Sequence, residues 1–153
     1  MKFFLVGDGE WRERLEAAVR ESGQQKHFVF TGLVSPAEVP ALVGVMDMLV
    51  HLSLREGLPR ALPQALAAGR PVVAYDCDGA REVCLDNQTG FLIRPGHYAR
   101  LKESVLQLAN DSALRTRLGE CGREFVRQNF SVEQMVGALA TLYQKMKPSQ
   151  AGN

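Results

Sequence analysis

The chain has 153 residues, a length that fits a single domain with one hydrophobic core. Its 18 lysines and arginines stand against 17 aspartates and glutamates, and this near-neutral balance argues against a nucleic-acid-binding protein and against a polybasic membrane contact. Cys77, Cys84 and Cys121 lack metal-ligand spacing and leave at least one thiol unpaired, so we expect no metal site and a reducing, cytoplasmic compartment. No apolar stretch approaches the roughly 20 residues of a spanning helix, so we expect no transmembrane segment.

Short apolar runs alternate with helical patterns in the first third of the chain. The run 3–6 is followed by a helical stripe that stops at Gly23, and the second run covers 27–30. The segment 35–38, Ser-Pro-Ala-Glu, has the form of a capping box. Because Pro40 lies too deep for a smooth helix, we expect a turn there and then a short helix.

The same alternation continues toward the end of the chain. Three further apolar runs follow, at 48–52, 71–75 and 91–93. A helix ending at Gly69 follows the first of these, and three helical patterns follow the last. The final helix carries Met135 and Met146, which we expect in the core, and we expect residues 148–153 to form a loose tail.

Unbroken apolar strands separated by helices are typical of a parallel sheet that is covered on both faces. The pattern therefore predicts an α/β domain over residues 1–147, with a doubly wound open parallel sheet of five strands and helices on both faces. In such a sheet, ligands bind beyond the carboxyl ends of the strands, where the strand order reverses. This rule selects the loops after the first and third runs as candidate binding loops.

The loop after the third run contains the residues with the clearest chemistry. Gly57 and Pro59 stand at a strand-to-helix junction, where free backbone N–H groups and the helix dipole attract phosphate. Glu56 would repel a phosphate there but could accept hydrogen bonds from sugar hydroxyls. Gln64 lies eight positions later, roughly two helical turns along, within reach of a ribose. The alternatives are that Glu56 only complements the helix dipole and that Gln64 is an exposed helix former.

The segment 53–69 resembles the donor-site motif of the group 1 family of retaining glycosyltransferases, which have the two-domain GT-B fold. That motif has two glutamates eight positions apart, Gly-Leu-Pro between them and a small-residue helix that ends in glycine. The segments 71–75, 78–83 and 90–96 match the family in order and spacing. The likeness runs from about Phe3 to about Tyr143.

The resemblance implies a donor-binding half of a GT-B enzyme, which moves a sugar from a UDP- or GDP-sugar to an acceptor with retention of configuration. It implies that Glu56 holds hydroxyls of the transferred sugar, and that neither a metal nor another cofactor takes part. The remaining residues that it places around the nucleotide diphosphate sugar are Gly7, Gly9, Leu33 in the loop 31–34, Gly57, Leu58, Pro59 and Gln64.

Two departures from the family have consequences. Gln64 stands where the family has its second glutamate. The family's donor domain also begins one strand and one helix earlier, with a unit that supplies an arginine and a lysine to the diphosphate. Arg55 and Arg60 are candidates to replace these cations, although solvated arginines are the simpler interpretation. We therefore expect the isolated chain to be inactive.

The absent strand lies, in the family, between the first and third strands of this chain. Because a gap would leave two rows of backbone groups unpaired, we expect these strands to pair directly, which gives the order 2-1-3-4-5. The acceptor-binding domain of the family is also outside this chain, so an acceptor-binding domain or partner chain is expected. The alternative function is a non-catalytic nucleotide-sugar-binding subunit, or a remnant that serves as an assembly surface.

Overall fold

The computed structural model describes residues 1–146, and the chain forms two compact units, Met1–Val45 and Met46–Asn153. The residues 1–147 that we predict to form one donor-binding domain span both units, and that boundary stays a prediction. The predicted loose tail at 148–153 lies outside the described residues.

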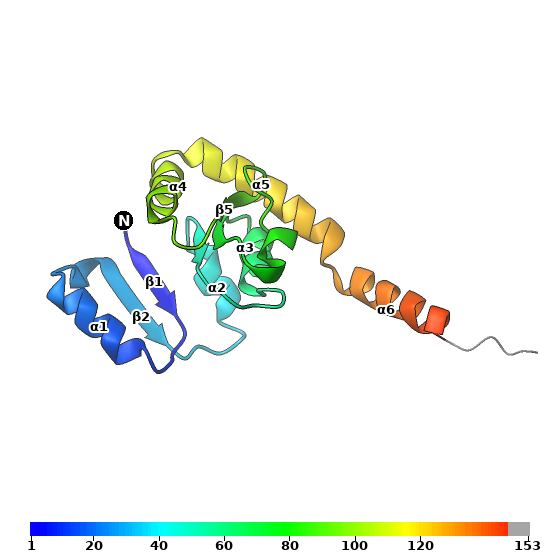
Figure 1. Ribbon diagram of the computed structural model, residues 1–153, viewed down its shortest axis with the longest axis horizontal. Coiled ribbons are helices and arrows are strands. Elements are labelled where there is room, and N and C mark those ends of the chain that lie inside the picture. Colours follow the sequence, from blue (N-terminus) through cyan, green and yellow to red (C-terminus); the bar gives the residue numbers. More distant parts are fainter. Residues whose placement is uncertain (147–153) are drawn as a thin grey trace, which may run out of the picture. The chain divides into compact units, whose positions relative to one another are not determined.

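The first unit contains two parallel strands and a connecting helix (Figure 1). Its elements are β1 (Phe3–Val6), α1 (Arg12–Glu21), the 3₁₀ turn η1 (Gln25–His27), β2 (Phe28–Gly32) and α2 (Val39–Gly44). The chain turns after α1 at Gly23, whose φ of 69° is in the left-handed region that glycine adopts without strain. The predicted turn before α2 is confirmed, because the Ser35 backbone N–H donates to the Glu38 carboxylate at 2.8 Å, as in a capping box.

The second unit contains a three-stranded parallel sheet in the order β3-β4-β5. Its elements are β3 (Leu49–His51), α3 (Ala61–Ala67), β4 (Val72–Tyr75), the 3₁₀ helix η2 (Asp78–Glu82), β5 (Gly90–Ile93), α4 (Tyr98–Asn110), α5 (Ser112–Asn129) and α6 (Val132–Met146). All four residues of the central strand β4 are buried, because strands flank it on both sides and helices cover it. The hydrophobic core of the chain is in this unit.

Close packing between α3 and α5 depends on glycines. A Cβ atom added at Gly119 would lie 2.1 Å from the Gly69 carbonyl oxygen, and one at Gly122 would lie 2.5 Å from Leu66. The backbones therefore approach at Gly119 to a distance that a side chain there would prevent, and Gly122 leaves room for the Leu66 side chain. This contact holds α3 against the longest helix of the unit.

The α/β fold with parallel strands is confirmed, but the predicted single sheet of five strands in the order 2-1-3-4-5 is not shown. Within residues 1–146, the strands of the first unit form the sheet β1-β2 and those of the second unit form the sheet β3-β4-β5. Phe3 and Phe4 of β1 are each 41% exposed. Water therefore reaches this strand, and unpaired backbone groups at a strand edge cost little where water reaches them.

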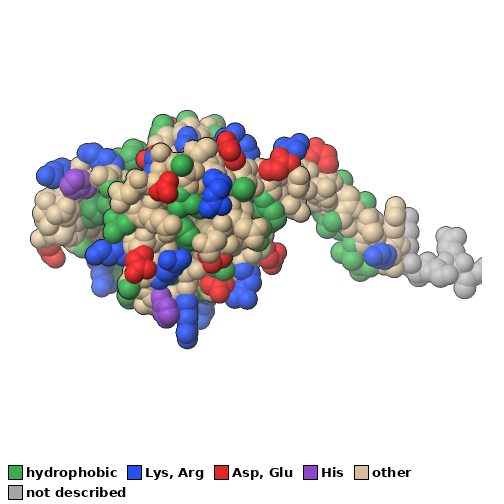
Figure 2. Space-filling view, turned by 90° about the horizontal axis from the view of Figure 1, so that it is seen from above, with side chains coloured by type: hydrophobic (Ala, Val, Ile, Leu, Met, Phe, Trp, Pro, Cys, Tyr) green, Lys and Arg blue, Asp and Glu red, His purple; other side chains and the backbone are tan. Residues whose placement is uncertain are grey.

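The predicted core positions of Met135 and Met146 are wrong, since these side chains are 58% and 68% exposed. None of the residues of α6 is buried, and hydrophobic side chains gather along this helix in Figure 2. Helical spacing made α6 amphipathic, but burial requires a second surface, and no described element covers this stripe. Along residues 1–146, every helix is too short or too polar to cross a membrane.

Candidate functional site

The candidate site of the second unit is the irregular segment 53–60 between β3 and α3. It starts at the carboxyl end of β3, where a parallel sheet places its ligands. Glu56 is near the middle of this segment, and its side chain is 40% exposed. The predicted sugar-binding carboxylate is therefore accessible from solvent.

Two neighbours orient the Glu56 carboxylate. The Ser53 hydroxyl donates a hydrogen bond to Oε1 at 3.1 Å. His51 Nε2 lies 3.6 Å from the same oxygen, and this nitrogen is buried without a hydrogen-bond partner among the described residues. Both contacts fall on Oε1, so Oε2 keeps its capacity to accept hydrogen bonds from a ligand.

The residues after Glu56 present backbone donors. Gly57 and Leu58 are exposed, and neither N–H donates a hydrogen bond to any residue in the described part of the chain. Pro59 is fully buried and has no N–H to offer. The two amides belong to the loop itself, because α3 begins only at Ala61. They lie between β3 and α3, at the strand-to-helix junction that the sequence indicates, and their contact with a diphosphate stays a prediction.

Gln64 lies on the exposed side of α3, and its side chain forms no hydrogen bond within residues 1–146. It is free to contact a ligand, and the predicted contact with a ribose stays a prediction. Arg55 and Arg60 are exposed and form no ion pair with the described residues. This exposure is consistent with the simpler interpretation of both as solvated side chains.

A neighbouring loop makes contacts that the sequence analysis did not foresee. The Glu56 backbone N–H donates to Asp78 Oδ2 at 2.8 Å, and the Gly79 N–H donates to the Gly57 carbonyl oxygen at 3.0 Å. Asp78 and Gly79 follow β4, whose carboxyl end lies beside that of β3. Their position after a central strand was the available signal, because loops after adjacent parallel strands meet at one edge of the sheet.

The remaining predicted residues lie in the first unit, at the carboxyl ends of β1 and β2. Gly7 has a φ of 117°, and its N–H donates to the Gly32 carbonyl oxygen at 3.2 Å. A Cβ atom at Gly7 or Gly9 would meet nothing within 4 Å, and Leu33 is 86% exposed. These residues therefore leave open space around the loop, and their contact with a ligand stays a prediction.

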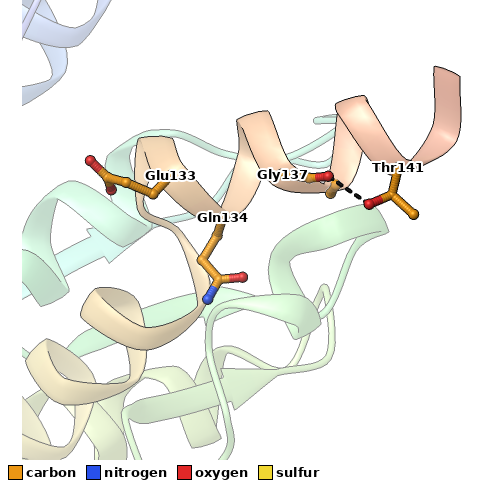
Figure 3. A pocket seen from close by; sticks show the side chains of 5 residues that line it. Glu133, Gln134, Gly137 and Thr141 are labelled. Carbon is orange, nitrogen blue, oxygen red and sulfur yellow. Dashed lines mark hydrogen bonds between the residues drawn. The ribbon is translucent and has the colours of Figure 1, made fainter. Parts of the chain in front are cut away.

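Two hollows of the second unit lie away from the candidate loop. One, of about 340 Å³, runs beside Gly137 on α6, where Thr141 Oγ1 donates to the Gly137 carbonyl oxygen at 2.9 Å (Figure 3). The labelled Glu133 and Gln134 side chains point in different directions and do not converge on a common point (Figure 3). The other hollow contains Arg115 and Arg123, which donate to carbonyl oxygens at the ends of α4 and α3. Neither hollow contains a predicted site residue.

The sequence is similar to a family of known enzymes. Residues 1–125 match the family described as Glycosyl transferases group 1. The chain is 33% identical to a 2-deoxystreptamine glucosyltransferase of Streptomyces kanamyceticus, over 94% of this chain and 37% of that protein. It is 31% identical to the uncharacterized glycosyltransferase MJ1178 of Methanocaldococcus jannaschii, over 94% of this chain and 40% of that protein. The chain thus spans about two fifths of the length of these relatives.

Several solved structures have a fold similar to that of this chain. A crystal structure of Anabaena Alr3699/HepE in complex with UDP matches with a TM-score of 0.88 and 24% identity, over 95% of this chain and 41% of that chain. The C-terminal domain of a group 1 glycosyl transferase, LpcC of Francisella tularensis, matches with a TM-score of 0.73 and 24% identity, over 80% of this chain and 64% of that chain. At these identities the likeness establishes the fold.

Proposed function

Because the chain belongs to the group 1 family of glycosyl transferases, we propose that it binds a nucleotide diphosphate sugar as the donor-binding part of a retaining glycosyltransferase. The complex of Alr3699/HepE with UDP supports a nucleotide diphosphate as the ligand class. The chain spans 37% of the length of the glucosyltransferase relative, so the acceptor is bound by a domain or a chain beyond these residues.

One observation carries the proposal: an accessible carboxylate stands directly before two exposed amides without partners. Glu56 provides the carboxylate, and Gly57 and Leu58 provide the amides. An ionised carboxylate only accepts hydrogen bonds, so it suits sugar hydroxyls, whereas backbone N–H groups only donate and suit phosphate oxygens. The order of the groups therefore matches a sugar joined to a diphosphate.

The same groups explain how the chain would assist transfer. Negative charge develops on the diphosphate as the bond to the sugar breaks, and fixed N–H donors aimed at that charge lower the barrier. Gly57 and Leu58 supply such donors at the sugar end of the diphosphate. Glu56 holds the sugar through its hydroxyls and orients the reacting carbon.

The test is a titration of the chain with UDP, GDP and ADP and with their sugars. We expect binding to at least one nucleotide sugar, and Glu56→Gln should weaken it about 10- to 100-fold, because a charged hydrogen bond is worth roughly 1.5–3 kcal/mol. Binding of the free nucleotide should barely change. Glu103→Gln, an exposed position on α4, is the matched control. If no nucleotide sugar binds at millimolar concentration, the proposal is wrong and the chain is a remnant.

Transfer to an acceptor separates an enzyme from a binding subunit. We expect no turnover by this chain alone, because it spans 37% of the length of the glucosyltransferase relative and we propose that the acceptor is bound outside these residues. Steady transfer by the purified chain without a partner would contradict this expectation. Binding without transfer supports the donor-binding role.

Gln64 provides a sharper test of where the ribose lies. A glutamate would accept hydroxyl protons with a charged group, so Gln64→Glu should tighten nucleotide binding about five- to tenfold. The gain should shrink with 2′-deoxynucleotides. An equal gain with both sugars would show that residue 64 does not face the ribose.

A further inference from the structure

We propose that Asp78 is a positioning residue, which holds the backbone of Glu56 and Gly57 in the shape that presents the Glu56 carboxylate to the donor sugar. This inference rests on the proposed function, because it assigns to Asp78 a task at the same site. It adds a residue from the loop after β4 to the part of the site that lies in the segment 53–60 after β3.

Two hydrogen bonds from the loop after β4 enclose the Glu56–Gly57 dipeptide. The Glu56 N–H donates to Asp78 Oδ2 at 2.8 Å, at the start of the dipeptide. The Gly57 carbonyl oxygen accepts from the Gly79 N–H at 3.0 Å, at its end. The segment 53–60 has no regular secondary structure of its own, so these two bonds restrict the backbone angles that direct the Glu56 side chain.

The two loops approach so closely that only glycine fits at position 79. A Cβ atom there would lie 2.1 Å from the Gly57 carbonyl oxygen, well inside van der Waals contact. The following residues Ala80 and Val83 are buried, at 4% and 0% exposure, so the loop that holds Asp78 is anchored in the core. The exposed segment is therefore tied to a rigid support.

The backbone conformation of Asp78 would suit a glycine better, so the presence of an aspartate at this position needs an explanation. Its φ of 45° is in the left-handed region, which strains a residue other than glycine, although aspartate and asparagine tolerate it best. A glycine would remove that strain but would have no carboxylate to accept the Glu56 N–H. The hydrogen bond explains why an acidic residue occupies a position that suits glycine.

The tether formed by these two hydrogen bonds fixes the dipeptide that carries the Glu56 carboxylate, whereas Gln64, the predicted ribose contact, lies on α3. The tether occupies the Glu56 N–H and the Gly57 carbonyl oxygen, and the N–H groups of Gly57 and Leu58 stay available. Loss of the tether should therefore weaken a nucleotide sugar more than the corresponding free nucleotide. A residue needed only for folding would affect both ligands equally.

Three variants test the proposal. Asp78→Gly removes the acceptor and the backbone strain together, and Asp78→Asn keeps an acceptor oxygen and tolerates the left-handed backbone. Asn87→Gly is the matched control, because Asn87 is the other described non-glycine residue with positive φ, at 60°, and it lies outside the site. Melting temperature, hydrogen exchange of the Glu56 amide and ligand affinity are measured for each variant.

We expect Asp78→Gly to speed exchange of the Glu56 amide at least tenfold without lowering the melting temperature. The ratio of nucleotide-sugar affinity to free-nucleotide affinity should fall about tenfold. Asp78→Asn should restore both properties, and Asn87→Gly should change neither. If hydrogen exchange of the Glu56 amide is unchanged in Asp78→Gly, Asp78 does not hold this amide. If exchange is faster but the affinity ratio is unchanged, Asp78 holds the amide but does not present the Glu56 carboxylate to the sugar.

Failure of the proposed function is distinguishable from failure of this inference. If the wild-type chain binds no nucleotide sugar, the donor site itself is wrong, and the assignment of Asp78 to sugar positioning falls with it. The exchange measurement needs no ligand, so it still decides whether Asp78 holds the Glu56 amide.

Discussion

The two units of the chain use the same kinds of element and bury them very differently. In the second unit, β4 is completely buried, and Val73, Phe91 and Leu108 belong to one core cluster. In the first unit, α1 has no buried residue, and Phe3 and Phe4 on β1 are each 41% exposed. Parallel strands joined by a helix therefore do not guarantee a core.

The difference follows from the number of covering surfaces. The second unit has three strands and several helices, so a central strand is enclosed on both edges and faces. The first unit pairs only two strands, and two-stranded sheets have marginal stability of their own. Apolar side chains that would be buried in a larger sheet stay in contact with water.

Removing a buried leucine from the second unit should lower the free energy of unfolding more than any other change considered below. Leu108→Ala should lower the free energy of unfolding by about 2–5 kcal/mol, because it leaves a cavity in the core cluster. Leu15→Ala on α1 should cost about 1 kcal/mol or less, since Leu15 is already 44% exposed. For Leu108→Ala, the free energy of unfolding is measured by urea unfolding followed by far-UV circular dichroism. Fluorescence of Trp11, the single tryptophan, reports on the first unit. Equal losses for both leucines would contradict the comparison.

A medium effect is expected where α3 and α5 touch. Gly119→Ala should destabilise the second unit by about 1–3 kcal/mol, because its Cβ would lie 2.1 Å from the Gly69 carbonyl oxygen and the helices must separate. Gly137→Ala on α6 is the matched control, since its Cβ would meet nothing within 4 Å. The control should stabilise its helix by up to about 1 kcal/mol. Thermal unfolding distinguishes the two, and a Gly119→Ala protein as stable as the wild type would show that the contact is looser than described.

The smallest effect is electrostatic and lies in the first unit. The Ser35 hydroxyl, which donates to Glu38 at 2.7 Å, is the main cause that lowers the pKa of this glutamate below its ordinary value of 4.5. Because the pKa of Glu38 is lower in the folded state than in the unfolded state, its ionisation stabilises the folded protein at any pH above the unfolded pKa. This stabilisation is lost as the pH falls through the folded pKa. Ser35→Ala should raise the pKa of Glu38 toward 4.5 in an NMR titration. The pKa of Glu124, which Arg127 lowers in the second unit, should stay the same.

Local patterns in the amino-acid sequence were enough to predict the succession of elements and the loop that carries the candidate site. The run 3–6 coincides with β1, and glycines with positive φ follow α1 and α3, because alternation, helical spacing and glycine turns are local properties of the chain. Glu56 and its neighbours were found in the same way, since a strand, a turn and a helix start are adjacent in sequence.

Which residues meet and which are covered depends on tertiary packing, and local patterns do not record it. The bond between Asp78 and Glu56 joins positions 22 residues apart, and no local pattern records such a distance. The predicted burial of Met135 failed for a related reason. An apolar pattern states that a surface can be buried, but burial happens only where a second surface is present, and that depends on the packing of elements far apart in the chain.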